Sequence, residues 1–465
     1  MKLKKLNRIV VVGGGISGLT IAYVLLNRNR DLDITVLEAE NRPGGKIWTE
    51  KTDGFLCEKG PNGFLDNKPW TLELCKSLNI KPLRSNENSK KRFIYLNEKL
   101  NALPDSPKAF IKSDLLSWSG KLRLLLEITA PKGPADETVA DFILRRLGKE
   151  ALDRLIDPMA SGIYAGDPYK MSIQNCFPRI KELEQEYGSL IKALFKIRKE
   201  KKAQKKSNGT SQVSVAPGGT LTSFYDGAQT ITDSLAEKLG NRVKLGAPVQ
   251  GITKNNNSYQ VYIPNETLEA DIVIIASPAY TAAEILNDFD SDLSKSLLKI
   301  SYPHVSVVCF GYRKEKLKHP LNGFGFLVPF VEGRKILGTL WDSSIFPNRA
   351  SEGHALLRTM VGGAKFPDIA MLDNSKLIDL VFDELKPILD LSTDPDLVRV
   401  YRWEKAIPQY LLGHNNILNS IDELLNRYQG LYLAGNSYRG IGINDCVENG
   451  YKLAENILNT IELNR

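Results

Sequence analysis

The hydrophobic pattern at the start of the chain predicts a strand, a helix and a second strand. Residues 8–12 (RIVVV) form a short β-branched run of the kind found in buried parallel strands. A glycine-rich turn follows, and apolar positions with helical spacing over residues 16–26 predict a helix. Residues 33–37 (DITVL) form a second apolar run. We therefore expect one βαβ unit over residues 8–38.

A similar pattern lies near the end of the chain. Residues 431–434 (LYLA) predict a strand, residues 435–442 a glycine-rich turn, and the apolar spacing after them a helix that reaches residue 456. Asp445 and Glu448 have the spacing of a capping box, so we expect this helix to begin at Asp445.

The intervening chain adds further elements. Apolar runs or alternation predict strands at residues 243–245, 258–263, 271–278, 305–312 and 324–328. Helical spacing predicts helices at residues 122–128, 139–147, 151–156, 182–197 and 222–239. Residues 203–213 are expected to form a surface loop. The helices gather in the middle of the chain, whereas strands and helices alternate after residue 283 and indicate a second sheet.

Length, charge and cysteine content exclude several classes of protein. A chain of 465 residues exceeds the size of one growing core, so two or three domains are expected. The net charge of 62 − 54 = +8 is small for this length and gives no reason to expect nucleic-acid binding. Five scattered cysteines predict no disulfide framework and a reducing compartment. No apolar run approaches the roughly 18 residues of a membrane span.

Gly13, Gly15 and Gly18 stand between the first strand and the first helix, where each has a mechanical role. In this pattern the first glycine permits a tight turn, the second lets a pyrophosphate approach the backbone, and the third lets the helix pack closely on the strand. Glu38 ends the second strand, where its carboxylate can accept hydrogen bonds from a ribose. The arrangement predicts a dinucleotide at the helix N-terminus.

Two basic segments leave alternatives open. Residues 192–206 carry eight lysines and arginines and one acid, and form either a solvated helix end or a patch for anionic lipid headgroups. Residues 108–126 mix apolar and basic side chains, as an interfacial helix pair would, but core packing explains the same pattern equally well. The isolated histidines and cysteines predict no metal site.

Several short runs resemble a known family. Arg42-Pro-Gly-Gly45, directly after Glu38, resembles the FAD-binding amine oxidase superfamily. More specific runs extend along nearly the whole chain and are similar to those of the protoporphyrinogen oxidase family; they are GPNGFL at 60–65, SGIYAGD at 161–167, GFGFLVP at 323–329, Arg402-Trp403, IPQY at 407–410 and GINDC at 442–446.

The resemblance implies an α/β fold with three parts. These are a discontinuous Rossmann-like FAD-binding domain of residues 1–91, 213–282 and 397–465, a helical insertion of residues 92–212 that contacts substrate or membrane, and a mixed-sheet substrate domain of residues 283–396. It also implies noncovalent FAD. The residues that would bind it are Gly13, Gly14, Gly15, Ile16, Ser17, Gly18, Glu38, Ala39, Arg42, Gly45, Lys46, Gly60, Pro61, Asn62, Gly63, Val249, Trp403, Gly435, Ile441, Gly442 and Ile443.

The implied reaction is the six-electron oxidation of protoporphyrinogen IX to protoporphyrin IX. Three two-electron hydride transfers to FAD are expected, with dioxygen as the final acceptor and hydrogen peroxide as the product. Asn62 matches the residue that lies over the flavin and Arg92 one that binds a propionate. Phe324 matches an aromatic residue that stacks on the macrocycle, and Gly162 a backbone contact to it. A solvated surface position for Arg92 and ordinary core packing for Phe324 and Gly162 remain open.

Other readings of the sequence differ in substrate or in class. A coproporphyrinogen III oxidase of the same fold is the nearest alternative, and in that branch we expect aspartate in place of Asn62 and proline in place of Asn444. Gly63 departs from the family, in which serine is expected. An amine oxidase or carotenoid desaturase would not explain the tyrosine-containing run at 161–167. A flavoprotein that only carries a tetrapyrrole between partners is a third reading.

Partners and location follow from the resemblance alone. The substrate is apolar, and the family implies a cytoplasmic protein with, at most, peripheral contact with the cytoplasmic face of the membrane. A homodimer and transfer of the product to a ferrochelatase are possibilities that the sequence leaves open.

Overall fold

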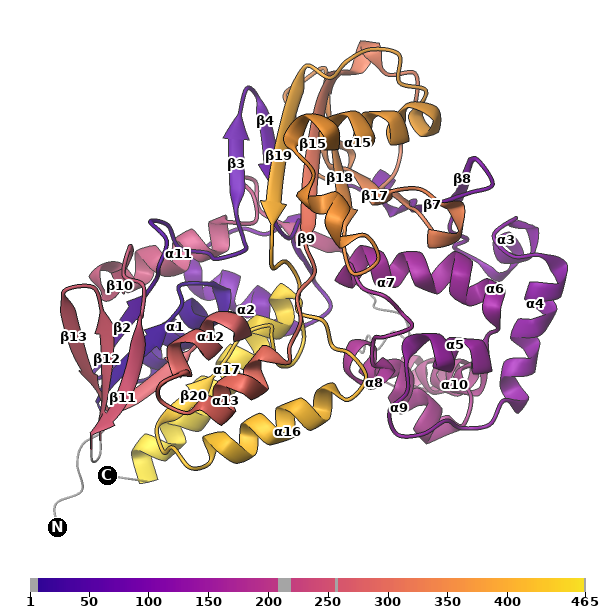
Figure 1. Ribbon diagram of the computed structural model, residues 1–465. Helices are drawn as coiled ribbons and strands as arrows, with labels where there is room; N and C mark the ends of the chain where they lie inside the picture. The colour runs from indigo at the N-terminus through magenta and orange to yellow at the C-terminus, as the bar shows by residue number, and fades with distance from the viewer. Residues whose placement is uncertain (1–6, 208–218, 256–257, 464–465) are drawn as a thin grey trace.

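A five-stranded parallel sheet joins the two ends of the chain. The computed structural model (Figure 1) describes residues 7–207, 219–255 and 258–463. The strand order of this sheet is β10-β2-β1-β14-β20. The strands are β1 (Arg8–Val12), β2 (Asp33–Leu37), β10 (Val243–Lys244), β14 (Ile272–Ile275) and β20 (Leu431–Leu433). Because all pairs are parallel, the carboxyl ends of β1, β14 and β20 lie at the same edge. The predicted βαβ unit is therefore present, and the C-terminal strand lies two strands away from β1.

Helices cover one face of this sheet, and a small sheet with further helices covers the other. The first face packs against α1 (Ile16–Arg28), α2 (Pro69–Leu78), α11 (Thr230–Leu239) and α17 (Ile443–Leu463). The second face packs against β11 (Gly251–Asn255), β12 (Ser258–Ile263), β13 (Glu266–Ala270), α12 (Ala279–Leu286), α13 (Ser291–Leu298) and α16 (His414–Leu425). With both faces covered, the strands are apolar throughout, which explains the continuous runs in the sequence.

A seven-stranded mixed sheet forms the second layer system. Its order is β19-β15-β18-β17-β16-β7-β8, and only β16 and β7 run parallel among its pairs. The strands are β7 (Phe93–Leu96), β8 (Lys99–Ala102), β15 (Val305–Arg313), β16 (Gly325–Leu327), β17 (Ile336–Trp341), β18 (His354–Gly362) and β19 (Leu397–Trp403). Helix α15 (Asn374–Leu389) packs on it through buried leucine and valine side chains. The short helix α14 (Asp342–Ile345) follows β17 directly.

Two smaller sheets complete the strands. Strands β3 (Thr49–Thr52) and β4 (Phe55–Glu58) form a hairpin, and β5 (Phe64–Leu65), β9 (Leu221–Ser223) and β6 (Leu83–Arg84) pair in that order. The helical part of the chain contains α3 (Pro107–Lys112), α4 (Trp118–Leu125), α5 (Val139–Arg146), α6 (Lys149–Ala151), α7 (Asp157–Tyr164), α8 (Ile173–Cys176), α9 (Pro178–Tyr187) and α10 (Leu190–Ser207).

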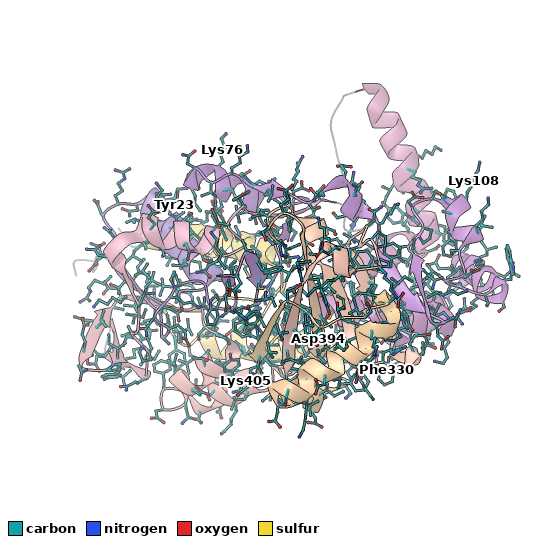
Figure 2. The ribbon with its side chains drawn as sticks, turned by 90° about the horizontal axis from the view of Figure 1, so that it is seen from above. Tyr23, Lys76, Lys108, Phe330, Asp394 and Lys405 are labelled. Carbon is teal, nitrogen blue, oxygen red and sulfur yellow. The ribbon has the colours of Figure 1, made fainter. Side chains whose placement is uncertain are left out.

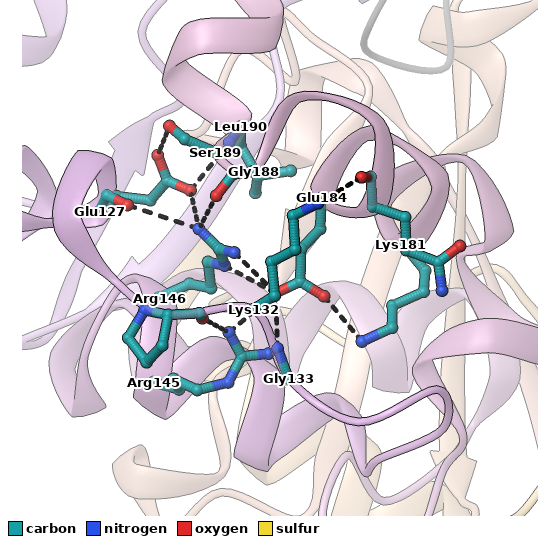
Figure 3. A network of polar contacts seen from close by, with 12 residues as sticks. Glu127, Lys132, Gly133, Arg145, Arg146, Lys181, Glu184, Gly188, Ser189 and Leu190 are labelled. Carbon is teal, nitrogen blue, oxygen red and sulfur yellow. Dashed lines mark hydrogen bonds and ion pairs between the residues drawn. The ribbon is translucent and has the colours of Figure 1, made fainter.

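A buried ionic network holds the helical part together (Figure 3). Arg146 is fully buried and pairs with Glu127 at 2.9 Å and with Glu184 at 2.8 Å. Glu127 also accepts hydrogen bonds from the backbone N–H groups of Leu190 and Ile191, the first residues of α10. The carboxylate therefore fixes the N-terminus of a basic helix, whose last turns project from the body of the molecule (Figure 2).

Several local predictions were wrong. Residues 222–229 are not helical, because β-branched Thr222 lies in β9 and Gly227, with φ of +99°, interrupts the chain before α11 begins at Thr230. The loop predicted at 203–213 is helical to Ser207, since lysine, alanine and glutamine favour helix, and residues 208–213 lie outside the described residues. Helix α17 begins at Ile443 and not at Asp445.

The predicted domain boundaries stay a prediction. Strand pairing nevertheless joins two segments to the seven-stranded sheet that the prediction had assigned to other domains. Strands β7 and β8 were placed in the helical insertion, and β19 in the nucleotide-binding domain. All three lie in the seven-stranded sheet, because β7 pairs with β16 and β19 pairs with β15. Pairing between distant segments leaves no signal in the local pattern of apolar residues.

Candidate functional site

The turn between β1 and α1 is shaped by its glycines in three different ways. Gly13 has φ of +109°, which side chains other than glycine rarely adopt. A methyl group on Gly18 would lie 2.1 Å from the carbonyl oxygen of Gly13, so close packing excludes any side chain there. Gly15 differs, because its φ is −75° and a methyl group would meet no atom within 4 Å.

Gly15 provides the test of whether a nucleotide fits this turn. Neither backbone geometry nor packing within the described residues requires glycine at this position. Gly15 is the N-cap of α1, no side chain caps the helix, and Ile16 and Ser17 begin its first turn. The free N–H groups and the open space above Gly15 suit a diphosphate that approaches the backbone.

Glu38 and the second glycine turn lie against the first. The Glu38 carboxylate is buried and accepts hydrogen bonds from the backbone N–H groups of Gly14, at 2.7 Å, and Glu40, at 2.9 Å. The remaining lone pairs of its oxygens stay available to a ribose hydroxyl. Gly44 donates its N–H to the Gly14 carbonyl at 2.8 Å, so the two turns touch. Exposed Ala39 follows Glu38 in the same loop.

Arg42 and Lys46 stabilise the second turn from within. The Arg42 guanidinium donates to the carbonyls of Pro43, Gly45 and Ile47 and stacks on Trp48 at 3.8 Å. Lys46 donates to the carbonyl of Lys405 at 2.7 Å, and burial lowers the pKa of its amine to about 8. Arg42 thus stabilises the shape of the loop, and its contact with the cofactor stays a prediction.

The C-terminal glycine turn meets the N-terminal one at the shared sheet edge. Ala434 donates its N–H to the Ile275 carbonyl at 2.9 Å, which places Gly435 beside the end of β14. Ile441 packs in a neighbouring apolar cluster, and Gly442 directly precedes Ile443, the first residue of α17. Asp445, the third residue of α17, accepts a hydrogen bond from the Gly442 N–H at 3.2 Å. Asp445 therefore caps the helix from within its first turn and is not the residue at which the helix begins.

Side chains from other elements hold this C-terminal turn; of these, Tyr410 belongs to the quoted run at 407–410, whereas no motif pointed to Tyr302 or His414. Tyr410 donates its hydroxyl to the Asn436 carbonyl at 2.6 Å, and the hydroxyls of Tyr302 and Ser437 lie 2.7 Å apart. His414 stacks on Tyr410 and contacts the Tyr438 carbonyl through Nε2 at 3.0 Å. Burial lowers the pKa of His414, which keeps its ring neutral.

Residues 60–63 lie between the nucleotide turn and the second sheet. A methyl group on Gly60 would lie 1.9 Å from the Lys46 carbonyl oxygen, and one on Gly63 would lie 2.2 Å from that of Thr222. Pro61 and buried Asn62 stand between these two close contacts. Trp403, a predicted cofactor residue, donates its indole N–H to the Lys59 carbonyl at 2.8 Å. Val249, half-buried, follows Ala247, whose N–H is bound by the Glu38 carbonyl.

The predicted substrate residues lie on the second sheet and the helix beside it. Arg92 is an exposed residue, but partial burial of its guanidinium lowers the pKa of that group, which lies 4.9 Å from the centre of the Phe324 ring. Phe324 is half-buried, and its backbone binds the Lys91 carbonyl and the Trp341 N–H. Gly162 in α7 lies against Leu327, whose Cδ2 atom would be 2.6 Å from a methyl group there. Arg92 and Phe324 therefore come together, and Gly162 adjoins the same strand.

Four buried charged residues near Asn62 were not predicted. Glu58 and Arg349 are fully buried and pair at 3.2 Å, and Asp342 lies 4.0 Å from Arg358. Desolvation raises the pKa values of both carboxyls and lowers that of Arg349. The signal that could have found them is a charged residue within or beside an apolar run, as in FLCE, LLRTM and GTLWD.

Asn444 is one of the two residues used in the sequence analysis to distinguish the protoporphyrinogen from the coproporphyrinogen III oxidases, and its side chain contacts two neighbouring elements. Its carboxamide binds the Thr71 hydroxyl in α2 and the Leu65 carbonyl in β5. Both contacts fix the start of α17 against neighbouring elements. Nothing within the described residues forms a group of three or more histidine, cysteine, aspartate or glutamate side chains that could hold a metal ion.

Comparison with known proteins agrees with this architecture. Residues 16–458 match the family described as flavin containing amine oxidoreductase. The chain is 35% identical to the chloroplastic protoporphyrinogen oxidase of Oryza sativa subsp. japonica, over 96% of this chain and 87% of that protein. It is 31% identical to the coproporphyrinogen III oxidase of Bacillus subtilis, over 95% and 96% of the two chains.

Solved structures share the fold. A protein from Exiguobacterium sp. 255-15, provisionally named protoporphyrinogen oxidase, superposes with a TM-score of 0.83 and 26% identity, over 97% of this chain and 98% of the other. Cyclohexylamine oxidase from Brevibacterium oxydans, at 18% identity over 99% and 100% of the two chains, superposes with a TM-score of 0.69 and shows the likeness of fold alone. The chain therefore belongs to the flavin-containing amine oxidoreductase family and, within it, to the group that includes the protoporphyrinogen and coproporphyrinogen III oxidases.

Proposed function

We propose that this protein oxidises protoporphyrinogen IX to protoporphyrin IX with FAD as cofactor and dioxygen as final acceptor, releasing hydrogen peroxide. The observation that carries the proposal is a continuous chain of contacts from Arg92 through Phe324, Trp341 and Asp342 to Asn62. It connects the predicted propionate and ring contacts to the loop predicted to lie over the flavin. The relatives named protoporphyrinogen oxidase support the same substrate class.

The protein's own contribution is positioning. FAD, when bound, supplies the two-electron acceptor for each of the three steps. The glycine turns at 13–18, 42–45 and 435–442 and the Glu38 carboxylate would hold the cofactor. Arg92 would bind a propionate as a guanidinium fork, while Phe324 and the Gly162 backbone would face the macrocycle. No strong acid–base pair is needed, because aromatisation of the substrate favours the reaction.

Arg92→Ala should raise KM for protoporphyrinogen about tenfold and lower kcat less than about threefold, because a contact made equally in ground and transition states affects KM alone. Lys91→Ala is the matched control, since Lys91 is an exposed cation next to it in the sequence. Steady-state kinetics of both variants check this. An unchanged KM for Arg92→Ala, or an equal rise for Lys91→Ala, would remove the propionate role.

Purified yellow protein mixed in air with protoporphyrinogen and, separately, with coproporphyrinogen III tests the function and its nearest alternative. The proposal predicts a faster gain of porphyrin fluorescence from protoporphyrinogen, with peroxide formed in step. A faster reaction with coproporphyrinogen III would assign the protein to the other branch. If the protein oxidised neither porphyrinogen, the proposed function would be overturned.

We also propose peripheral membrane contact through an apolar patch on the helical part. Its exposed side chains are Ile111, Trp118, Leu122, Leu125 and Leu126, with Lys108, Lys112 and Lys121 beside them. Leu115 and Leu116, in the same segment, are buried, and Phe110 and Leu124 are half-buried, so the core-packing alternative explains those positions but not the exposed ones. Lys108 lies at the end of the molecule from which α10 projects (Figure 2). Among the described helices, none combines the length and apolar character that crossing a bilayer requires.

Replacing Trp118, Leu122 and Leu125 together by serine should reduce sedimentation with vesicles of phosphatidylglycerol and phosphatidylcholine by about tenfold or more, because three apolar side chains no longer enter the interface. Leu298→Ser is the control, since Leu298 is 59% exposed and lies in α13. Equal sedimentation of the triple variant and the unchanged protein would contradict the proposed contact.

A further inference from the structure

We propose that Asp342 is a positioning residue that orients the Asn62 carboxamide, so that Asn62 Oδ1 is offered as a hydrogen-bond acceptor to an N–H group of a bound ligand. The inference deepens the proposed function and rests on it for the identity of the ligands. Nothing in the sequence motifs points to Asp342, which follows the apolar strand β17 and begins α14.

The backbone around Asn62 is fixed on both sides. Gly60 lies against the carbonyl oxygen of Lys46, and Gly63 lies against that of Thr222. Arg358 adds a third restraint, since its guanidinium donates to the carbonyls of Glu58, at 3.0 Å, and Gly60. With its backbone held in this way, Asn62 has little freedom beyond rotation of its own side chain.

That rotation is decided by Asp342. The Asn62 Nδ2 atom donates to Asp342 Oδ1 at 2.9 Å, and both side chains are buried. Because a carboxamide nitrogen only donates hydrogen bonds, this contact turns the amide oxygen of Asn62 away from Asp342. The polarity that Asn62 presents to its surroundings is therefore set by its partner.

Burial raises the pKa of the Asp342 carboxyl, and two neighbouring guanidinium groups act against that rise. Arg358 lies 4.0 Å from Asp342 Oδ2, and the charges of Arg358 and Arg349 both oppose the effect of burial on the Asp342 carboxyl. Arg349 also pairs with Glu58, so two carboxyl groups and two guanidinium groups share one buried cluster. The backbone N–H of Trp341, next to Asp342, binds the Phe324 carbonyl and ties α14 to the predicted substrate residues.

Asn62 Oδ1 is left without a donor among the described residues, although it is buried. A buried acceptor without a donor is unfavourable, and a ligand N–H would supply the missing hydrogen bond. Every pyrrole of a porphyrinogen carries an N–H, and the aromatic porphyrin has lost half of them. The isoalloxazine ring is a second source of N–H groups, so the chemistry is shared and the experiment must separate the two sources.

The test uses FAD-loaded enzyme reduced with dithionite under argon, in which protoporphyrinogen binds without being oxidised. The dissociation constant of protoporphyrinogen is measured by ultrafiltration for the unchanged protein, for Asp342→Asn, for Asn62→Ala and for the double variant. An amide at 342 can turn either way, so Asp342→Asn should weaken binding about tenfold if the substrate supplies the N–H. In the Asn62→Ala background the same change should have less than a twofold effect, because Asp342 acts through Asn62.

Thr339→Val is the matched control, since Thr339 is buried in β17 and bonds the Thr359 hydroxyl at 3.0 Å. It should leave the dissociation constant within twofold, whatever it does to stability. Equal weakening by Asp342→Asn in both backgrounds would show a merely structural role and overturn the inference.

A substrate-free arm separates the flavin from the substrate. If the N–H belongs to the isoalloxazine, Asp342→Asn should shift the flavin midpoint potential and leave porphyrinogen binding unchanged; if it belongs to the substrate, only binding changes. No change in either measurement would refute the positioning role. Failure of the unchanged protein to bind porphyrinogen would instead refute the proposed substrate, and the potential would then decide the inference alone.

Discussion

Gly15→Val is expected to give a folded protein that no longer retains FAD. Gly15 has an ordinary φ of −75° and open space around it, so valine fits without a clash and costs the N-cap only about 1 kcal/mol. The added side chain occupies the approach to the free N–H groups of α1, where we expect the diphosphate. We expect FAD affinity to fall about a hundredfold, or ~3 kcal/mol.

The measurement is FAD retained after gel filtration, together with far-ultraviolet circular dichroism of the same sample. Gly18→Ala provides the contrast, since its methyl group would lie 2.1 Å from the Gly13 carbonyl oxygen and should lower stability as well as cofactor content. A Gly15→Val protein that folds and keeps its full FAD content would contradict a nucleotide at this turn.

Arg146→Met should lower the free energy of unfolding by about 3–5 kcal/mol, because it leaves the buried Glu127 carboxylate without its cationic partner. Glu127 would lose its guanidinium contact at 2.9 Å while still bound to the first turn of α10 (Figure 3). Glu184 would keep Lys181 and Arg145. The loss should therefore centre on the contact between η2 (Leu126–Thr129) and α10.

Urea unfolding of the FAD-loaded protein, followed by circular dichroism, measures this loss. Arg179→Met is the control on the same helical part, since the pair of Arg179 with Glu182 at 3.0 Å is exposed and should contribute less than about 1 kcal/mol. If the two variants unfolded at the same urea concentration, burial would not be what gives the network its strength.

The parts of the fold that were predictable are those coded by local patterns. The predicted strands at 8–12 and 258–263 coincide with β1 and β12, because the order of apolar residues in each segment matches the order of buried positions in the strand. The helix predicted at 182–197 is two helices, because Gly188, with φ of +74°, ends α9 and Glu127 starts α10 from a distant part of the chain. A contact supplied by a remote residue could not be inferred from spacing.

The site shows the same division. Gly13, Gly18 and Glu38 occupy the places that their motif requires, and the family is confirmed by the comparisons. The roles of Asp342 and Arg358 could not be predicted from the sequence. They come together with Asn62 only through the pairing of β17 with β18 and through the loop that contains Asn62. Burying a charged side chain without a partner is costly, so a charged residue within an apolar run predicts an oppositely charged residue beside it in the fold.

The most direct measurement is to mix the yellow enzyme with protoporphyrinogen in the strict absence of oxygen and record the visible absorbance of the flavin. We expect the flavin band to bleach as porphyrin absorbance rises, and to return when air is admitted. A flavin band that stays unchanged while protoporphyrinogen is present in excess would contradict electron transfer from this substrate and, with it, the proposed function.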